Sequence, residues 1–283
     1  MSLSANSMLV NISLSVWSGR KLDRAVSEEV DAQKDTKTRA GNYNKNLFAG
    51  VDELERVRRV SGFIRNWHKE NTLPWSDGGE RLLPMKNFLD YKKRLSQYEQ
   101  EFNDAVQNFC VRYADLVSAQ AFRMGALFKR DEYPTMDDIA HKFELRYTFS
   151  PVPEVHDFRV ETSEEVLQEL ETQYAKTYED RHKKLAQDLW LRLHDSLKHL
   201  ADRLSDGGDG EHRIFRDSLV TNAVDLCSLL TKLNVTNDPT LESARKQLEA
   251  AVCNLDPKDL RSSPDARKEI KSQVDDILKK FSF

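Results

Sequence analysis

The residues best suited to a recognisable chemistry lie between positions 34 and 46, in a polar stretch without helical or strand periodicity. Lysine and arginine side chains alternate there with threonine, asparagine and one tyrosine. Such cations contact phosphate oxygens, and a tyrosine ring offers a face on which a nucleic-acid base can stack. The stretch therefore supplies the candidate nucleic-acid-binding residues Lys34, Lys37, Arg39, Tyr43 and Lys45.

An ordinary solvated loop is the alternative interpretation of this stretch. Acidic residues lie in it or just before it and weaken its positive potential, namely Glu28, Glu29, Asp31 and Asp35. The local composition favours this alternative. Nucleic-acid binding is therefore our second hypothesis of function and not our first.

The signatures of common enzymes are missing from the sequence. It contains no Gly-rich phosphate loop, no GxSxG nucleophile motif, and no HExxH or CxxC metal motif. Asp195 and His199 have the i, i+4 spacing of helical metal ligands, but no second pair accompanies them, which favours a solvated helix face. We therefore expect no enzymatic activity, no metal and no cofactor.

The cysteines and the overall charge point to an ordinary reduced, cytoplasmic protein. Cys110, Cys227 and Cys253 are far apart among apolar helical neighbours, which predicts buried free thiols. The net charge of −4 gives no reason to expect nucleic acid. No apolar run approaches the ~18 residues of a membrane span, and the N-terminus lacks a basic secretory signal. We expect a protein of the host-cell cytoplasm with no membrane partner.

One long helix, expected from Pro84 to Phe128, organises the elements around these residues. Its apolar residues recur at alternating steps of three and four, and no Gly or Pro interrupts them before Gly125. From Phe109 to Ala121 three four-residue steps follow one another, a stutter that unwinds a left-handed supercoil. The aromatic content favours packing against several elements over a two-stranded coiled coil. The predicted stripe is Phe88, Tyr91, Leu95, Tyr98, Phe102, Ala105, Phe109, Tyr113, Val117, Ala121, Met124 and Phe128.

A second long helix is expected from the cap at Thr162–Glu165 to the glycine-rich linker at 207–210. It is similar in length to the first and leucine-rich along one face, so we expect the two to form an antiparallel hairpin. Shorter helices follow in 211–283. The predicted domains are residues 1–206 and 211–283, and the second is either a separate bundle or a layer packed on the hairpin.

Period-two alternation predicts strands at residues 9–17 and 143–149, with a third short strand at Phe158 and Val160. Isolated strands this few are unstable, so they should pair in a small antiparallel sheet. Trp75, in a turn-rich connector, is expected to be a buried anchor. The predicted fold class is mainly α with a small antiparallel β-sheet (α+β): a long helical hairpin capped by two or three short strands, plus short C-terminal helices.

Several segments of the first 170 residues resemble a family of phage and mobile-element proteins known as domain of unknown function 3150. The similar segments are Leu14–Leu22, Thr38–Asn46, Asn66–His68, Thr72–Asp77, Gly79–Pro84 and Tyr147–Pro153. The resemblance implies a bacteriophage or mobile-element origin. It brings no known activity or site, but it does mark Arg39–Asn46 as a feature of the fold or of the function.

Three hypotheses of function follow. The first is a non-enzymatic helical interaction protein of a phage or mobile element that associates with itself. The second is a nucleic-acid-binding accessory factor in phage replication or recombination. The third is an adaptor or inhibitor of a host defence or motor protein, whose partner is then a host or phage protein.

Overall fold

The computed structural model describes residues 3–154, 157, 162–204, 218–253 and 263–281. By their contacts they fall into two units. Unit 1 contains Met1–Asn11, Lys69–Tyr91 and Thr148–Phe283, and unit 2 contains Ile12–His68 and Lys92–Tyr147. Several long elements have residues in both units, and the two hydrophobic cores are described separately below.

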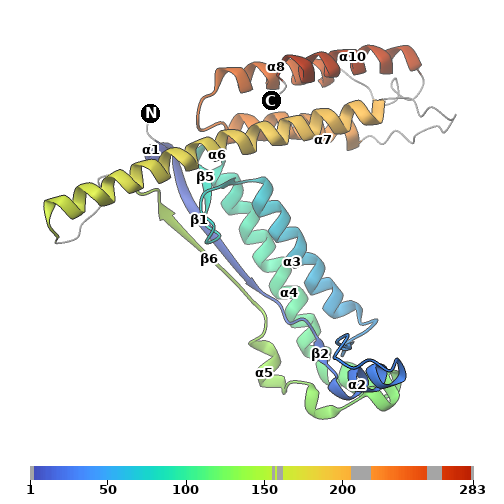
Figure 1. Ribbon diagram of the computed structural model, residues 1–283. Coiled ribbons are helices and arrows are strands. Elements are labelled where there is room, and N and C mark those ends of the chain that lie inside the picture. The colour runs from blue at the N-terminus through green and yellow to red at the C-terminus, as the bar shows by residue number, and fades with distance from the viewer. Residues whose placement is uncertain (1–2, 155–156, 158–161, 205–217, 254–262, 282–283) are drawn as a thin grey trace. The chain divides into compact units, whose positions relative to one another are not determined.

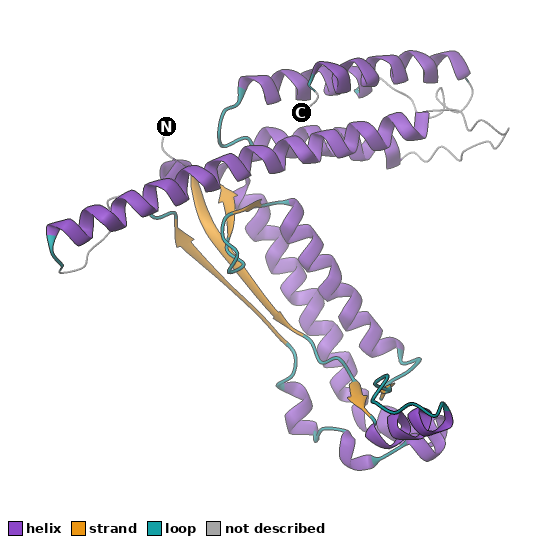
Figure 2. Cartoon of the chain, viewed as in Figure 1, coloured by secondary structure: helices purple, strands orange, loops and turns teal. Residues whose placement is uncertain are grey.

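A four-stranded sheet has the order β4-β5-β1-β6 (Figure 2). β1 pairs antiparallel with β5, with Ser7 opposite Pro84 and Val10 opposite Arg81, and β4 pairs antiparallel with β5. The short helix α1 (Leu3–Asn6) precedes β1. The strands are β1 (Ser7–Ser15), β4 (Leu73–Pro74), β5 (Arg81–Pro84) and β6 (Glu144–Pro151).

The core of unit 1 forms where three helices pack on the second long helix, α6 (Glu164–Leu204) (Figure 1). Leucines at four-residue spacing, from Leu185 to Leu197, present one buried stripe to these helices. The stripe contacts α7 (Ser218–Leu233), α8 (Pro239–Val252) and α10 (Pro264–Lys280). Asp238 and Ser263 cap the last two helices, each followed by a proline at the first turn.

Two arginines of unit 1 satisfy the backbone at the end of α3 (Asp52–Glu70). The Arg192 Nη2 donates to the carbonyls of Lys69 at 3.0 Å and Thr72 at 2.8 Å, and the Arg81 Nη2 donates to the same two carbonyls at 3.2 and 3.1 Å. The last carbonyls of a helix have no intrahelical partner. These two side chains therefore replace the missing bonds, one from β5 and one from α6.

The core of unit 2 forms around α4 (Met85–Met124), which packs against α3 and against the segment after Phe128. Phe48 lies at its centre, with ring centroids of Trp17, Phe109, Tyr113 and Tyr133 all within 5.7 Å of its own. The remaining elements are β2 (Arg20–Leu22), α2 (Arg24–Gln33), β3 (Asn44–Asn46), α5 (Met136–Ala140) and the 3₁₀ turns Gly125–Leu127 and Arg130–Glu132.

The predicted fold class is confirmed: the chain is mainly helical, with a small antiparallel sheet, one uninterrupted long helix and short C-terminal helices. The packing partners of the two long helices differ from the predicted hairpin. The stripe of α4 lies in a core with α3, and the stripe of α6 lies in a core with α7, α8 and α10. Only β4, β5 and short turns connect α3 to α4. The loop that must close to bring α3 against α4 is therefore much shorter, and its entropic cost lower, than the loop between α4 and α6.

The described helices of residues 211–283, which are α7, α8 and α10, all pack on α6. The predicted linker at 207–210 and the predicted strand at Phe158 and Val160 lie outside the described residues. The strands predicted at 9–17 and 143–149 correspond to β1 and β6. Trp75 is buried, as predicted, and its ring contacts that of Tyr178.

One predicted member of the α4 stripe is wrong. Ala121 is exposed, and Gln120 is buried in its place. A three-residue step from Val117 to Gln120 restores the helical stripe after two four-residue steps, and Met124 then follows on the same face. The sequence rule failed because it expects an apolar residue at each buried position, and this position holds an amide.

Candidate functional site

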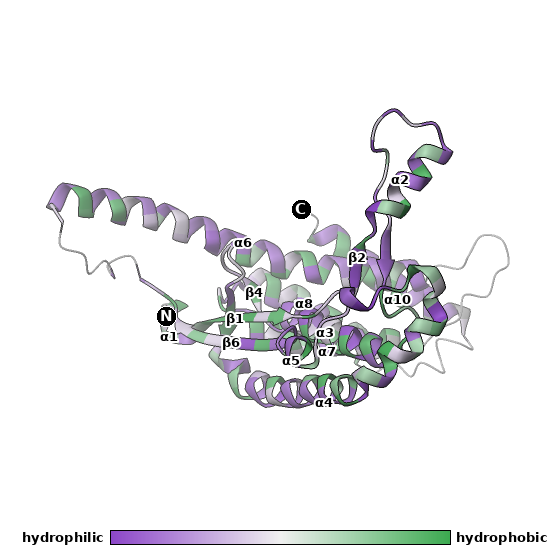
Figure 3. Cartoon of the chain, turned by 90° about the horizontal axis from the view of Figure 1, so that it is seen from below, coloured by the Kyte–Doolittle hydropathy of each residue, from purple (hydrophilic) through white to green (hydrophobic). Residues whose placement is uncertain are grey.

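The α2 loop, which we define as Lys34–Tyr43, carries four of the five predicted nucleic-acid-binding residues and connects α2 to β3. The side chain of Asp23 caps α2 by accepting a hydrogen bond from the Val26 N–H at 3.3 Å. β2 and β3 pair as a two-stranded antiparallel ribbon, with Lys21 opposite Lys45. The ribbon thus brings the two ends of the α2 segment together, and Figure 3 shows the largely hydrophilic loop beside the helix.

Hydrogen bonds hold the α2 loop against its own helix. The backbone N–H groups of Thr36 and Ala40 donate to the Asp31 carbonyl at 3.0 Å and the Asp31 Oδ1 at 3.3 Å. The N–H of Tyr43 donates to the Ser27 Oγ at 2.9 Å, and that hydroxyl donates to the Asp23 carbonyl at 2.7 Å. The loop backbone is therefore fixed by α2, while its side chains stay at the surface.

Lys45 does not belong to the nucleic-acid-binding set, which corrects the prediction. Its side chain is buried, with the Nζ 2.9 Å from the Asp23 Oδ2 and 2.6 Å from the Glu132 Oε2. The same ammonium donates to the Leu127 carbonyl at 3.1 Å. A lysine so enclosed is not accessible to a phosphate, because its ammonium is buried and already paired with two carboxylates. Its role is to join β3, the start of α2 and the segment around Glu132.

The buried Lys45 cluster changes the pKa of two of its members. The hydrogen bond from Lys45, helped by the Val26 N–H, lowers the pKa of Asp23 below its ordinary 3.8. Burial alone would lower the pKa of Lys45, but its contacts with Glu132 and Asp23 outweigh burial and raise that pKa above 10.5. Both shifts favour the charged forms, so Asp23 and Lys45 form an ion pair across the neutral range.

The other four predicted residues lie at the surface of the α2 loop. Lys34, Lys37 and Arg39 are exposed, and within the described part of the chain no ion pair involves them. Tyr43 is 40% exposed. The structure therefore groups three solvated cations and one accessible ring on a single fixed loop.

Three more cations, Arg20, Lys21 and Arg24, are exposed on β2 and the first turn of α2. Sequence reasoning missed them because they precede the loop by at least ten residues, and only the β2–β3 pairing brings them to its base. The only signal of these residues in the sequence is the basic pair Arg20-Lys21, which Leu22 separates from the capping Asp23.

Two adjoining hollows lie along the α2 loop. The first has a volume of about 320 Å³ and largely apolar walls that include Val30, Gly41 and Tyr43. The second has a volume of about 400 Å³ and is lined by Lys37 and Arg39 among others. Asp31 and Thr36 line both, so the two hollows share a wall.

A second surface of interest is the N-terminal half of α6, which we define as Glu164–Lys184. None of its residues is buried, and Leu185 is the first buried residue of the helix. Val166 is 44% exposed, and the half-buried Leu167 and Leu170 continue its apolar stripe. Further along the same stripe, the Tyr174 hydroxyl donates to the Pro153 carbonyl at 3.1 Å and the Tyr178 ring packs on that of Trp75, so the part left open by the described residues of unit 1 is the first two turns, around Val166.

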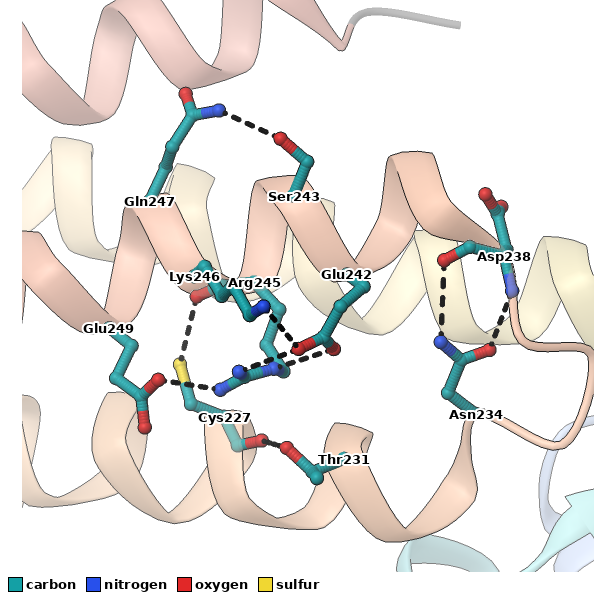
Figure 4. A network of polar contacts seen from close by, with 10 residues as sticks. All are labelled: Cys227, Thr231, Asn234, Asp238, Glu242, Ser243, Arg245, Lys246, Gln247 and Glu249. Carbon is teal, nitrogen blue, oxygen red and sulfur yellow. Dashed lines mark hydrogen bonds and ion pairs between the residues drawn. The ribbon is translucent and has the colours of Figure 1, made fainter.

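A polar network within α7 and α8 of unit 1 has a structural explanation (Figure 4). The guanidinium of the buried Arg245 donates two hydrogen bonds to Glu242 at 2.9 Å and one to Glu249 at 2.8 Å. The Sγ of Cys227 lies 3.8 Å from the Arg245 carbonyl, and burial raises the pKa of that thiol to about 11. A fully paired arginine and a protonated buried thiol offer no reactive group.

All three cysteines are free, as predicted, but only Cys227 is fully buried. Cys110 is half-buried and Cys253 is exposed, so the prediction of three buried thiols is wrong for these two. Among the described residues, His, Cys, Asp and Glu side chains nowhere gather in threes that could hold a metal ion. No helix in the described part of the chain has the length and apolarity to cross a bilayer.

Comparisons of the chain with protein-family models, with curated proteins and with solved structures found no match. The resemblance to domain of unknown function 3150 therefore stays a prediction.

Proposed function

We propose that this protein is a non-enzymatic helical interaction protein of a phage or mobile element, and that it assembles with copies of itself. The supporting observation is the start of α6, where Val166 is 44% exposed and Leu167 and Leu170 are only half-buried, before Tyr174 and Tyr178 make contact with Pro153 and Trp75. Exposed apolar stripes of this kind are costly in water and mark interaction surfaces.

The charges along this half of α6 favour a second copy of the chain as the partner. Residues 164–171 carry four glutamates and no basic residue, whereas 176–184 carry Lys176, Arg181, Lys183 and Lys184 against two acids. Two copies laid antiparallel place each acidic end opposite the basic end of the other. Such an isologous pair is closed by a two-fold axis and leaves no free surface for further growth.

Light scattering of the full chain during gel filtration tests the self-association. We expect a dimer, and we expect Leu170→Glu to give a monomer because it places a charge in the apolar stripe. Gln168→Glu adds the same charge on the opposite face of the helix and should leave the dimer intact. A monodisperse wild-type monomer at tens of micromolar would overturn the proposal.

A pair of charge-reversed variants tests the antiparallel arrangement. The first has Glu164, Glu165 and Glu169 changed to Lys, and the second has Lys176, Lys183 and Lys184 changed to Glu. Each alone should be monomeric, and an equimolar mixture should form a heterodimer, because opposite charges then meet at both ends. If either variant dimerises alone as well as the wild type does, the charges do not set the pairing.

Nucleic-acid binding is the second candidate function, and the observation that favours it is the set of solvated cations on the α2 loop. It predicts that the chain binds DNA in a strongly salt-dependent manner, because bound cations displace counterions from the phosphates. Replacing Lys37 and Arg39 by Ala should weaken binding, whereas Lys45 is unsuitable for this test because it is buried. Undetectable binding at low salt would exclude this function.

A further inference from the structure

We propose that the α2 loop binds single-stranded nucleic acid, with one unstacked base in the hollow at Val30 and Tyr43 and the adjacent phosphates on Lys37 and Arg39. This inference rests on the nucleic-acid-binding function proposed above and specifies its ligand.

The first step of the argument is the hollow itself. Its volume of about 320 Å³ lies at the lower end of the range for ligand pockets, which suits a single ring better than a whole cofactor. Its walls are largely apolar, and Val30 of α2 and Tyr43 of the loop are 46% and 40% exposed, so both side chains face water. A planar base would cover both.

The second step is the charge beside the hollow. Lys34 lines it directly, and Lys37 and Arg39 line the adjoining hollow, which shares Asp31 and Thr36 with the first. An apolar ring site next to cations that form no ion pair with any described residue matches the two parts of a nucleotide, a base and a phosphate. An apolar protein side chain would fill the ring site but would leave these cations without a counterpart.

The third step separates single strands from duplexes. A base in a duplex is stacked and paired, so its faces are not available to a side chain without unpairing. The acids Glu28, Asp31 and Asp35 lie among the cations and oppose the dense phosphate array of a duplex. Stacking on an exposed ring tolerates any base, so we expect little sequence preference.

Fluorescence anisotropy with the full chain tests the proposal, using a labelled oligothymidine and a duplex of the same length at low salt. We expect the single strand to bind about tenfold more tightly than the duplex, and Tyr43→Ala to remove about tenfold of that affinity. Tyr43→Phe keeps the ring and should bind as the wild type does. Lys37→Ala and Arg39→Ala should weaken both ligands and reduce the salt dependence.

Three outcomes would overturn the inference. If Lys37→Ala and Arg39→Ala weaken binding but Tyr43→Ala does not, nucleic-acid binding stands and the base site is wrong. Equal or tighter binding of the duplex would likewise leave nucleic-acid binding standing and show that the base site is wrong. If neither ligand binds the wild-type chain, both the inference and the nucleic-acid-binding function fail, and the hollow is left to an apolar side chain of a protein partner.

Discussion

The two longest helices of this protein have almost the same length and similar apolar stripes, yet they are buried to very different extents. α4 has 40 residues, and its stripe is buried from Tyr91 to Val117. α6 has 41 residues, and none of the first 21 is buried. The difference lies in the neighbours: α3, Phe48 and the segment around Tyr133 cover α4, whereas α7, α8 and α10 cover only the second half of α6. An apolar stripe shows that a helix needs partners, but not whether its own chain supplies them.

The largest effect that tests this contrast is expected in the core of α4. Phe109 is fully buried, and its ring contacts those of Phe48, Tyr113 and Phe143. Phe109→Ala should lower the free energy of unfolding by about 4 kcal/mol, because it removes buried area and leaves a cavity. Val166→Ala in the exposed half of α6 should change it by less than about 0.5 kcal/mol. Urea denaturation measures both, and comparable losses would contradict the contrast.

A smaller but still large effect is expected at the buried Lys45. Lys45→Met should cost about 3 kcal/mol, since it leaves two carboxylates enclosed without their cation. Lys37→Met, on the same segment but exposed, should be nearly neutral and serves as the matched control. If the two variants are equally stable in thermal denaturation, Lys45 is not the residue that holds this region together.

The loss at Lys45 should also depend on pH in a defined way. The lowered pKa of Asp23 means that its contribution is present above 3.8 and is lost as the pH falls through the lowered value. The raised pKa of Lys45 means that its contribution is present below 10.5 and is lost as the pH rises through the raised value. The stability difference between wild type and Lys45→Met should therefore be large near neutral pH, and it should shrink as the pH falls through the lowered pKa of Asp23 or rises through the raised pKa of Lys45.

The smallest effect is a predicted gain at Gln120 of α4. Its side-chain amide is fully buried, and neither Nε2 nor Oε1 has a hydrogen-bond partner among the described residues. Gln120→Leu should raise the free energy of unfolding by about 1 kcal/mol, because an unsatisfied buried amide is replaced by an apolar side chain of similar size. Gln107→Leu, at an exposed position of the same helix, should give no gain. A loss at Gln120 would show that its amide has a partner.

Helical and strand periodicity predicted the elements that are long enough to repeat a pattern. α4, α6, β1 and β6 were found in this way, and so was the burial of Trp75. β2, β3, β4 and β5 have only two to four residues each, too few for alternation to be visible. The packing of α3 on α4 was not predicted, because the sequence analysis paired the two long helices on the basis of their similar length. The partner of α4 is instead the helix that lies next to it along the chain.

The candidate site was predictable only in part. The polar stretch stood out because it lacks periodicity, and Lys34, Lys37, Arg39 and Tyr43 are indeed at its surface. The burial of Lys45 was invisible, because its partner Glu132 lies far along the chain and an isolated lysine carries no sign of an ion pair. Charge type can be read from a sequence, but the pairing of charges requires the fold.

The division of the chain has a consequence for its synthesis on the ribosome. Unit 2 is complete once Tyr147 has been made, whereas unit 1 draws on the first 11 residues and on everything after Thr148. The carbonyls at the end of α3 receive Arg192 only after 122 further residues have been added beyond Glu70. Because domains fold as they emerge, unit 2 should close first, while the carbonyls at the end of α3 wait for Arg192 from the second half of the chain.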